Sequence, residues 1–184
     1  DDKKDDPDTV RIRARFPGSA GKTRVRITAV LGQNVLGQVD GKTTLGALQA
    51  ADVVWIAEKI DRSHGKAYRV EEYFDEEGRK NSHRFSDLAT PTPRVLTTKL
   101  GSPPGLHANT HTIQVVTLTV SIFADDPQAL PRVWSDLPLD PRHERFGVKD
   151  SFSERFAGRP ATRALERSLP VIVERGANVA TSGL

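Results

Sequence analysis

Alternating apolar and polar positions near the start of the chain predict two β-strands. From Val10 to Phe16 every second residue is apolar and the residues between are arginines, and a similar alternation returns from Arg24 to Leu31. A period of two is typical of a strand with one buried face. Residues 17–21 (PGSAG) supply turn chemistry between the two stretches. The pattern therefore predicts a β-hairpin.

The apolar positions also suggest a register for this hairpin. Joining the two apolar faces pairs Ile12 with Ile27 and sets arginines directly opposite one another. The opposed pairs would be Arg13 with Arg26 and Arg15 with Arg24. Because opposed like charges destabilise a sheet by up to about 1 kcal/mol, we expect compensation from solvent, the acidic residues 1–8, another strand, a neighbouring chain or a polyanion. The candidate protein-contact residues are Arg11, Arg13, Arg15, Arg24 and Arg26.

The middle of the chain reads as strands separated by loops. Residues 32–46 are rich in glycine and predict a loop, and Leu45–Ala51 predicts a short helix. Further strands are expected where β-branched and aromatic residues gather or alternate. These stretches are Val53–Ala57, Tyr68–Phe74 with a hairpin return at Arg79–Phe85, Val95–Leu100, and Thr112–Phe123.

After Asp125 the pattern shifts towards helices. Asp150 or Ser151 has the side chain of a helix N-cap. The expected elements are an extended stretch at Leu137–Pro141, a short helix containing Phe152 and Phe156, a second short helix at Pro160–Leu169 and a strand at Val171–Val173. Strands first and helices later indicate an α+β class. We expect a β-rich fold, with hairpins in a mixed or antiparallel sheet or sandwich and a few short helices towards the C-terminus.

Composition narrows the function classes. The 184 residues carry a formal charge of +3, which is too small to argue for nucleic acid. No apolar run approaches the roughly 20 residues of a membrane-spanning helix, so we expect no membrane insertion. Without cysteine, the chain has neither disulfides nor thiolate sites. Because it has no methionine and begins at Asp1, we expect it to be part of a longer protein, with residues 1–9 as a flexible leading segment.

Several stretches suggest ligand chemistry without meeting its spacing. A P-loop needs four residues between its first glycine and the Gly-Lys pair, whereas 18–23 has two and 37–43 has three. His107 and His111 have a metal-like spacing but are expected at a boundary between loop and strand. No G-x-S-x-G nucleophile elbow is present. We therefore expect no catalytic residues, no metal and no cofactor, and we interpret Trp55 and Trp134 as core or interface anchors.

Two blocks of sequence resemble the contractile tail sheath proteins of phages and phage-derived injection systems. The first is Phe16–Lys22 followed by Arg24–Ile27, and the second runs from Thr117–Phe123 through Trp134–Pro141 to His143–Phe146. The residues that match the family pattern are Pro17, Gly18, Gly21, Trp134, Leu137, Asp140, Pro141 and Ser153. Residues 32–112 have no counterpart, so the resemblance implies a single sheath-like domain over 10–184 with an insertion at about 32–112.

The resemblance implies a structural, non-catalytic role. Sheath subunits stack helically around an inner tail tube and contract, in a virion tail or injection particle assembled in the host cytoplasm. This chain would be a peripheral domain that contacts neighbouring sheath subunits and is monomeric by itself. The alternative is an adhesin-like or carbohydrate-binding β-module centred near Trp55, Tyr68 or Tyr73. A hydrolase would need a converging site that the sequence does not provide.

Overall fold

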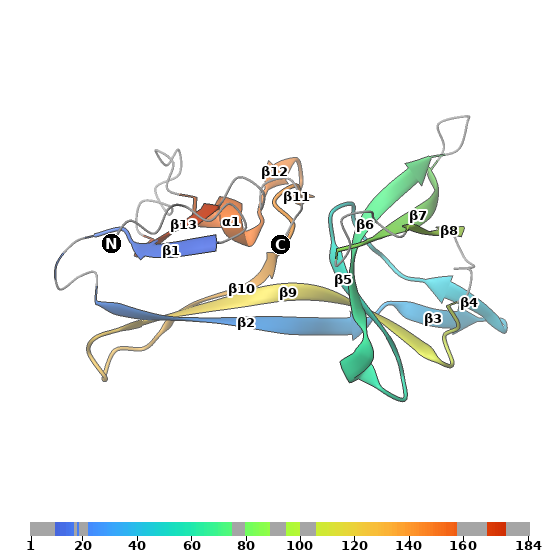
Figure 1. Ribbon diagram of the computed structural model, residues 1–184, viewed down its shortest axis with the longest axis horizontal. Coiled ribbons are helices and arrows are strands. Elements are labelled where there is room, and N and C mark those ends of the chain that lie inside the picture. The colour runs from blue at the N-terminus through green and yellow to red at the C-terminus, as the bar shows by residue number, and fades with distance from the viewer. Residues whose placement is uncertain are drawn as a thin grey trace. The chain divides into compact units, whose positions relative to one another are not determined.

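The chain divides into two compact units. The computed structural model describes residues 10–16, 18, 22–74, 80–88, 95–99, 106–157 and 169–175 (Figure 1). Residues 1–29 and 118–184 form what we call the terminal unit, and residues 30–117 form the central unit. The chain passes between them within strands β2 (Thr23–Asn34) and β9 (His111–Ala124). The central unit covers the 32–112 segment; that this segment is an insertion stays a prediction.

The central unit opens with a tight hairpin where the sequence predicted a loop. Strands β3 (Leu36–Val39) and β4 (Lys42–Leu45) pair antiparallel. Their turn residues Asp40 and Gly41 have φ of 49° and 75°, the combination of a type I′ turn. The loop prediction was wrong because the Asp-Gly pair, not the glycine content, decides the local structure. Leu45–Ala51 is likewise not helical.

The rest of the central unit is an antiparallel meander. It comprises β5 (Val53–Glu58), β6 (Lys66–Phe74), β7 (Lys80–Asp87) and β8 (Val95–Lys99), with a short 3₁₀-helix, η2 (Arg62–His64), between β5 and β6. The predicted hairpin between β6 and β7 is confirmed, with Val70 opposite Phe85. Strand β5 also pairs with the start of β9. Val54, Val70, Phe85 and Ile113 are fully buried in the core that these strands share.

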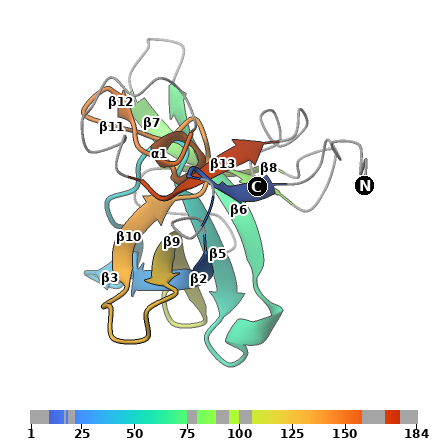
Figure 2. The same ribbon diagram turned by 90° about the vertical axis from the view of Figure 1, so that its left-hand side faces the viewer.

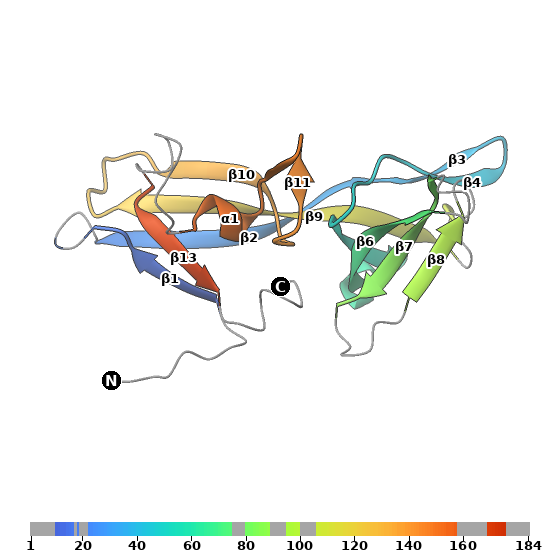
Figure 3. The same ribbon diagram turned by 90° about the horizontal axis from the view of Figure 1, so that it is seen from above.

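The terminal unit brings together the two ends of the chain. Strand β1 (Val10–Ala14) pairs antiparallel with β13 (Val171–Arg175), with Ile12 opposite Val173. Strands β2 and β10 (Arg132–Pro138) pair with β9. Strands β11 (Glu144–Arg145) and β12 (Val148–Lys149) form a small hairpin before helix α1 (Phe152–Arg155). Figures 2 and 3 show β1 and β13 side by side.

One apolar core holds the terminal unit together. It includes Val120 and Ile122 from β9, Phe152 and Phe156 from the helical segment, and Val171 from β13. Ile12 and Val25, one from each of the first two strands, pack against the same core. The β1–β13 pair and α1 therefore form one layer over the β2–β9–β10 layer.

The predicted hairpin between β1 and β2 is wrong. Their apolar faces do share one core, but β1 pairs with β13 and β2 pairs with β9. An alternating strand can satisfy its apolar face against any strand of matching pattern, and proximity in sequence does not select the partner. The helix predicted around Phe152 and Phe156 is confirmed in part, since it ends at Arg155. The predicted helix at 160–169 lies largely outside the described residues.

Candidate functional site

The segment from Trp134 to Phe156 contains several side-chain hydrogen bonds, ion pairs and ring contacts. The indole of Trp134 meets the ring of Phe156 edge-on, with centroids 5.5 Å apart and planes at 77°. Trp134 and Leu137 are three residues apart, yet both contact the same core. Asp136 between them has a φ of 55°, which interrupts the alternation of the strand. This bend is what brings both side chains to one face.

Asp140 is a buried carboxylate with a dedicated partner. Its Oδ1 accepts hydrogen bonds from the backbone N–H of Arg142 (2.8 Å) and from its Nε (3.1 Å), and its Oδ2 accepts from Nη2 (2.9 Å). Asp140 is fully buried, whereas the Arg142 side chain is half exposed. A buried charge is tolerated only when it is paired and hydrogen-bonded. Asp140 thus fixes the turn that follows β10.

A second buried polar group connects this turn to the helix. Nδ1 of buried His143 lies 2.6 Å from Oδ1 of Asp150, and Nε of Arg145 lies 3.4 Å from the other oxygen of that carboxylate. Ser151 caps α1 by accepting a hydrogen bond from the N–H of Glu154. The buried hydroxyls of Ser151 and Ser153 are 3.3 Å apart.

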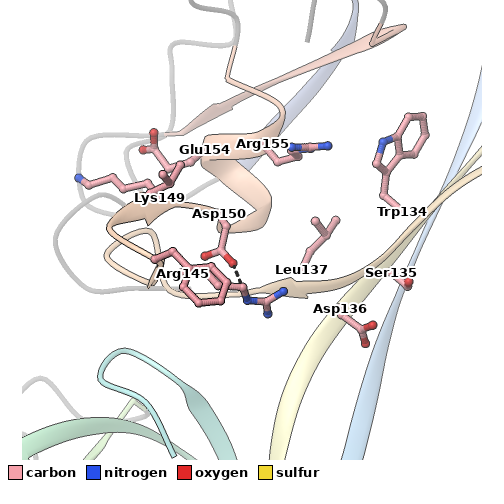
Figure 4. A pocket seen from close by; sticks show the side chains of 11 residues that line it. Trp134, Ser135, Asp136, Leu137, Arg145, Lys149, Asp150, Glu154 and Arg155 are labelled. Atoms are coloured by element: carbon pink, nitrogen blue, oxygen red, sulfur yellow. Dashed lines mark ion pairs between the residues drawn. The ribbon is translucent and has the colours of Figure 1, made fainter. Parts of the chain in front are cut away.

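An open pocket of about 470 Å³ lies over this segment (Figure 4). The carboxylate of Asp150 faces Arg145, and the Arg155 side chain points towards Trp134. The pocket is lined by Trp134–Leu137, Arg145, Phe146, Val148–Asp150, Glu154 and Arg155. Phe146 stands at the tip of the β11–β12 hairpin and is 98% exposed. Mixed charges and one aromatic edge suit a contact surface better than an enclosed ligand site.

The five predicted contact arginines do not form one face. Arg13 lies opposite Ile172, not Arg26, and its Nε is 2.5 Å from Oε1 of Glu174. The expected acidic compensation therefore comes from β13 for this residue. Arg11 lies opposite Glu174 in the same register. Two guanidinium nitrogens of Arg15, Nε and Nη2, are buried and have no hydrogen-bond partner among the described residues.

Arg24 and Arg26 lie together on β2 in a different environment. Their guanidinium carbons are 4.8 Å and 5.5 Å from the ring centroid of Phe123 on β9. Each such cation–π contact at an exposed site contributes about 0.5–1 kcal/mol. Two like charges about 7 Å apart on one strand face repel by about 0.6 kcal/mol in water. The contacts with Phe123 therefore offset the repulsion between Arg24 and Arg26, whereas the carboxylate of Glu174 compensates the charge of Arg13.

Of the other family-motif residues, Pro17 and Gly21 lie outside the described residues, and Gly18 has a φ of 76°. Pro141 is buried next to Asp140. The sequence analysis missed the partners Arg142, His143 and Asp150. One signal was available: Asp140 is followed by Pro141, and an Asp-Pro pair favours a turn in which the Asp side chain accepts a hydrogen bond from the backbone two residues on.

The three residue types of a hydrolytic triad meet at η2 but in the wrong order. Oδ1 of Asp61 accepts from the Ser63 hydroxyl, and Oδ2 faces Nδ1 of His64 at 2.5 Å. Ser63 is 3.3 Å from that same Nδ1. A triad needs the serine at one ring nitrogen and the carboxylate at the other. Here hydrogen bonds from Ser63 and then His64 lower the pKa of Asp61, as expected for a surface cap.

The described ranges contain neither a cluster of metal ligands nor a membrane-spanning helix. His107 precedes β9 and His111 begins it, and no cluster of three or more metal-ligating side chains occurs where the chain is described. Among the same residues, no helix is long and apolar enough to cross a bilayer.

Two of the three aromatic residues proposed for glycan binding, Tyr68 and Trp55, pack within the central unit. Tyr68 belongs to the core of the central unit. The Trp55 indole donates a hydrogen bond to the carbonyl of Arg62, and a methyl group at Gly65 would come within 2.3 Å of its Nε1. The Tyr73 side chain is outside the described atoms.

Comparisons with family models, curated proteins and solved structures find no match for this chain. Its function must therefore be argued from its own residues.

Proposed function

We propose that this chain is a peripheral, non-catalytic domain of a contractile tail sheath subunit. It belongs to a virion tail or injection-system particle, contacts neighbouring sheath subunits and, through the longer protein, an inner tail tube. Its fold is α+β, with α1 as one of a few short helices towards the C-terminus. Residues 32–112 are an insertion into the sheath-like domain.

One observation carries the proposal. The two sequence blocks that resemble the sheath family are separated by about ninety residues of chain, yet they contribute to a single core: Val25 from the first block packs in the same cluster as Trp134 and Leu137 from the second. The residues without a family counterpart build a separate core around Val70 and Phe85. An insertion between two halves of one domain has this arrangement.

The buried polar residues of the second block support a structural role. Asp140 is hydrogen-bonded to Arg142, and His143 is hydrogen-bonded to Asp150. These groups therefore stabilise the turn after β10 and the segment that leads into α1. A reacting group would instead be presented to a substrate within hydrogen-bond reach. The conformation that they stabilise leaves Phe146 and Arg145 exposed at the rim of the pocket.

Negative-stain electron microscopy of the longer protein tests the proposal. We expect hollow striated tubes, with this domain as density on their outer surface. The chain alone should sediment as a monomer, because the assembly elements of the family lie elsewhere. Dispersed particles of the longer protein at all salt concentrations would contradict the sheath assignment.

A matched pair of variants tests whether the outer density of the tubes comes from this domain. Asp140→Ala removes the buried partner of Arg142 and should loosen the second block, so that the outer density becomes smeared. Asp40→Ala, at the exposed β3–β4 turn, should leave that density ordered except at the turn itself. Equal effects of the two substitutions would argue against a special role for the second block.

A further inference from the structure

Two arginines and one aromatic ring form a compact cationic site in the terminal unit. Arg24 and Arg26 are both exposed and occupy alternate positions of β2, so they project from one face of the strand. Both guanidinium groups lie over the Phe123 ring, 4.8 Å and 5.5 Å from its centroid. We call these three residues the Arg-Phe-Arg stack.

Within the described part of the chain, no carboxylate lies at ion-pair distance from this stack. Within the described ranges, neither Arg24 nor Arg26 makes an ion pair with a carboxylate, whereas Arg13 does so with Glu174 and Arg145 with Asp150. Among the described residues, Arg13 and Arg145 thus have a carboxylate partner that Arg24 and Arg26 lack. That difference cannot follow from exposure alone, since the Arg13 and Arg145 side chains are also half exposed.

Contact with the aromatic ring preorganises the two guanidinium groups for binding an anion. A guanidinium stacked on a ring keeps its in-plane N–H donors free, and less side-chain entropy is lost when it binds. Carboxylates accept two parallel hydrogen bonds from such a fork. Arginines two residues apart on a strand stand about 7 Å apart, which is also the spacing of alternate side chains in an extended peptide.

We propose that the Arg-Phe-Arg stack binds an acidic segment of a partner protein, with carboxylates at alternate positions of an extended chain. The inference deepens the proposed function, on which it rests for its setting, by naming the chemistry of the contact. It also reduces the five predicted contact arginines to two. Each guanidinium takes one carboxylate, and the ring between them excludes water from one side of both ion pairs.

The surroundings favour a short acidic peptide over nucleic acid. A shallow pocket of about 500 Å³ beside the stack is lined by Lys22 and Arg24 but also by Asp125. Nucleic-acid sites need a basic stripe that follows several phosphates. Here Asp125 lines the same pocket as the basic residues and would repel a continuing phosphate backbone. A short segment that presents two carboxylates needs only the two arginines and does not have to pass Asp125.

Fluorescence anisotropy with a defined probe tests the inference. The probe is a fluorescein-labelled twelve-residue peptide that alternates glutamate and threonine, and its control replaces glutamate with glutamine. We expect wild-type protein to bind the glutamate peptide at least about tenfold more tightly than the glutamine peptide at low salt, because ion pairs are screened as salt rises.

Charge-matched variants locate the binding site. Arg24→Gln combined with Arg26→Gln should weaken binding of the glutamate peptide about tenfold or more. The control, Arg13→Gln with Arg145→Gln, removes the same charge from arginines that already have carboxylate partners and should change the affinity less than about twofold. Phe123→Leu keeps both charges and should weaken binding about two- to fivefold through loss of the stack.

Several outcomes would overturn the inference. They are failure of wild-type protein to bind the glutamate peptide, equal losses in the two double variants, or tighter binding of a twelve-nucleotide oligothymidine than of the peptide. If R24Q/R26Q fails to fold by circular dichroism, F123L decides by the same measurement. Tubes without peptide binding would remove this inference alone, and peptide binding without tubes would remove the sheath assignment alone.

Discussion

The terminal and central units are both β-rich, but their strands are paired over very different distances along the chain. In the central unit, β3 pairs with β4 and β5 to β8 follow one another in a meander. In the terminal unit, β1 pairs with β13 from the other end of the chain. Local pairing is encoded by turns that can be read directly, whereas distant pairing depends on the whole core. The sequence analysis predicted the local β6–β7 hairpin correctly but missed the equally local β3–β4 hairpin, and it chose the wrong partner for β1.

Removal of the central unit is the largest of the proposed changes to the chain. We expect the terminal unit to remain folded without it. Strands β2 and β9 pair with each other, and the central unit, residues 30–117, is the part of the chain between Ala29 and Leu118. Replacement of residues 30–117 by Asn-Gly, a type I′ turn, should therefore leave a folded terminal unit. Cooperative thermal unfolding and dispersed amide resonances would be the expected result. A disordered product would show that the terminal unit depends on the central one.

Large-to-small substitutions in the two cores should act separately. Phe156 and Phe85 are each fully buried, one in each unit. Truncation of either to alanine should cost about 3–5 kcal/mol of stability through lost burial and cavity formation. Hydrogen exchange should show lost protection in β9–β13 for F156A and in β5–β7 for F85A. Loss of protection in both units from either substitution would contradict two independent cores.

Cysteine pairs can decide between the observed and the predicted partner of β1. The chain has no native cysteine. Arg11→Cys with Glu174→Cys joins directly opposed residues, whose Cα separation in such a ladder of about 4.5–5.5 Å suits a disulfide. Mild oxidation should cross-link this pair and raise stability by about 2–4 kcal/mol. The control pair R13C/R26C, whose residues would be opposed in the predicted hairpin, should stay reduced. A cross-link in this pair would support the predicted β1–β2 hairpin instead of the observed β1–β13 pairing.

The smallest expected effect concerns the surface cap at η2. Hydrogen bonds from Ser63 and then His64 hold the pKa of Asp61 below its ordinary value. A lowered folded pKa contributes stability above the unfolded pKa, and this is lost as pH falls through the folded pKa. Ser63→Ala should raise the pKa of Asp61 more than His64→Ala does, as measured by carboxyl carbon chemical shifts. The reverse order would mean that His64 is the main cause.

The amino-acid pattern alone determined much of the secondary structure. Strands at 53–57, 68–74, 95–100, 112–123 and 171–173 were all predicted, as was the β6–β7 hairpin. A helix cap was predicted at Asp150 or Ser151, and Ser151 is the cap. Each of these depends on periodicity, β-branched content or capping within a few residues. The β3–β4 hairpin was missed although Asp40-Gly41 encodes it, because the glycines around it suggested a loop.

Only the tertiary structure decided which strands meet and which arginines contact a carboxylate or an aromatic ring. The apolar face of β1 fits β2 and β13 equally well as a pattern, and the shared core with Phe156 gives β1 its place beside β13. That choice places Glu174 beside Arg13 and leaves Arg24 and Arg26 with Phe123. The physical reason is that alternation specifies a face but not a partner. Partners are chosen by packing between residues far apart in the chain.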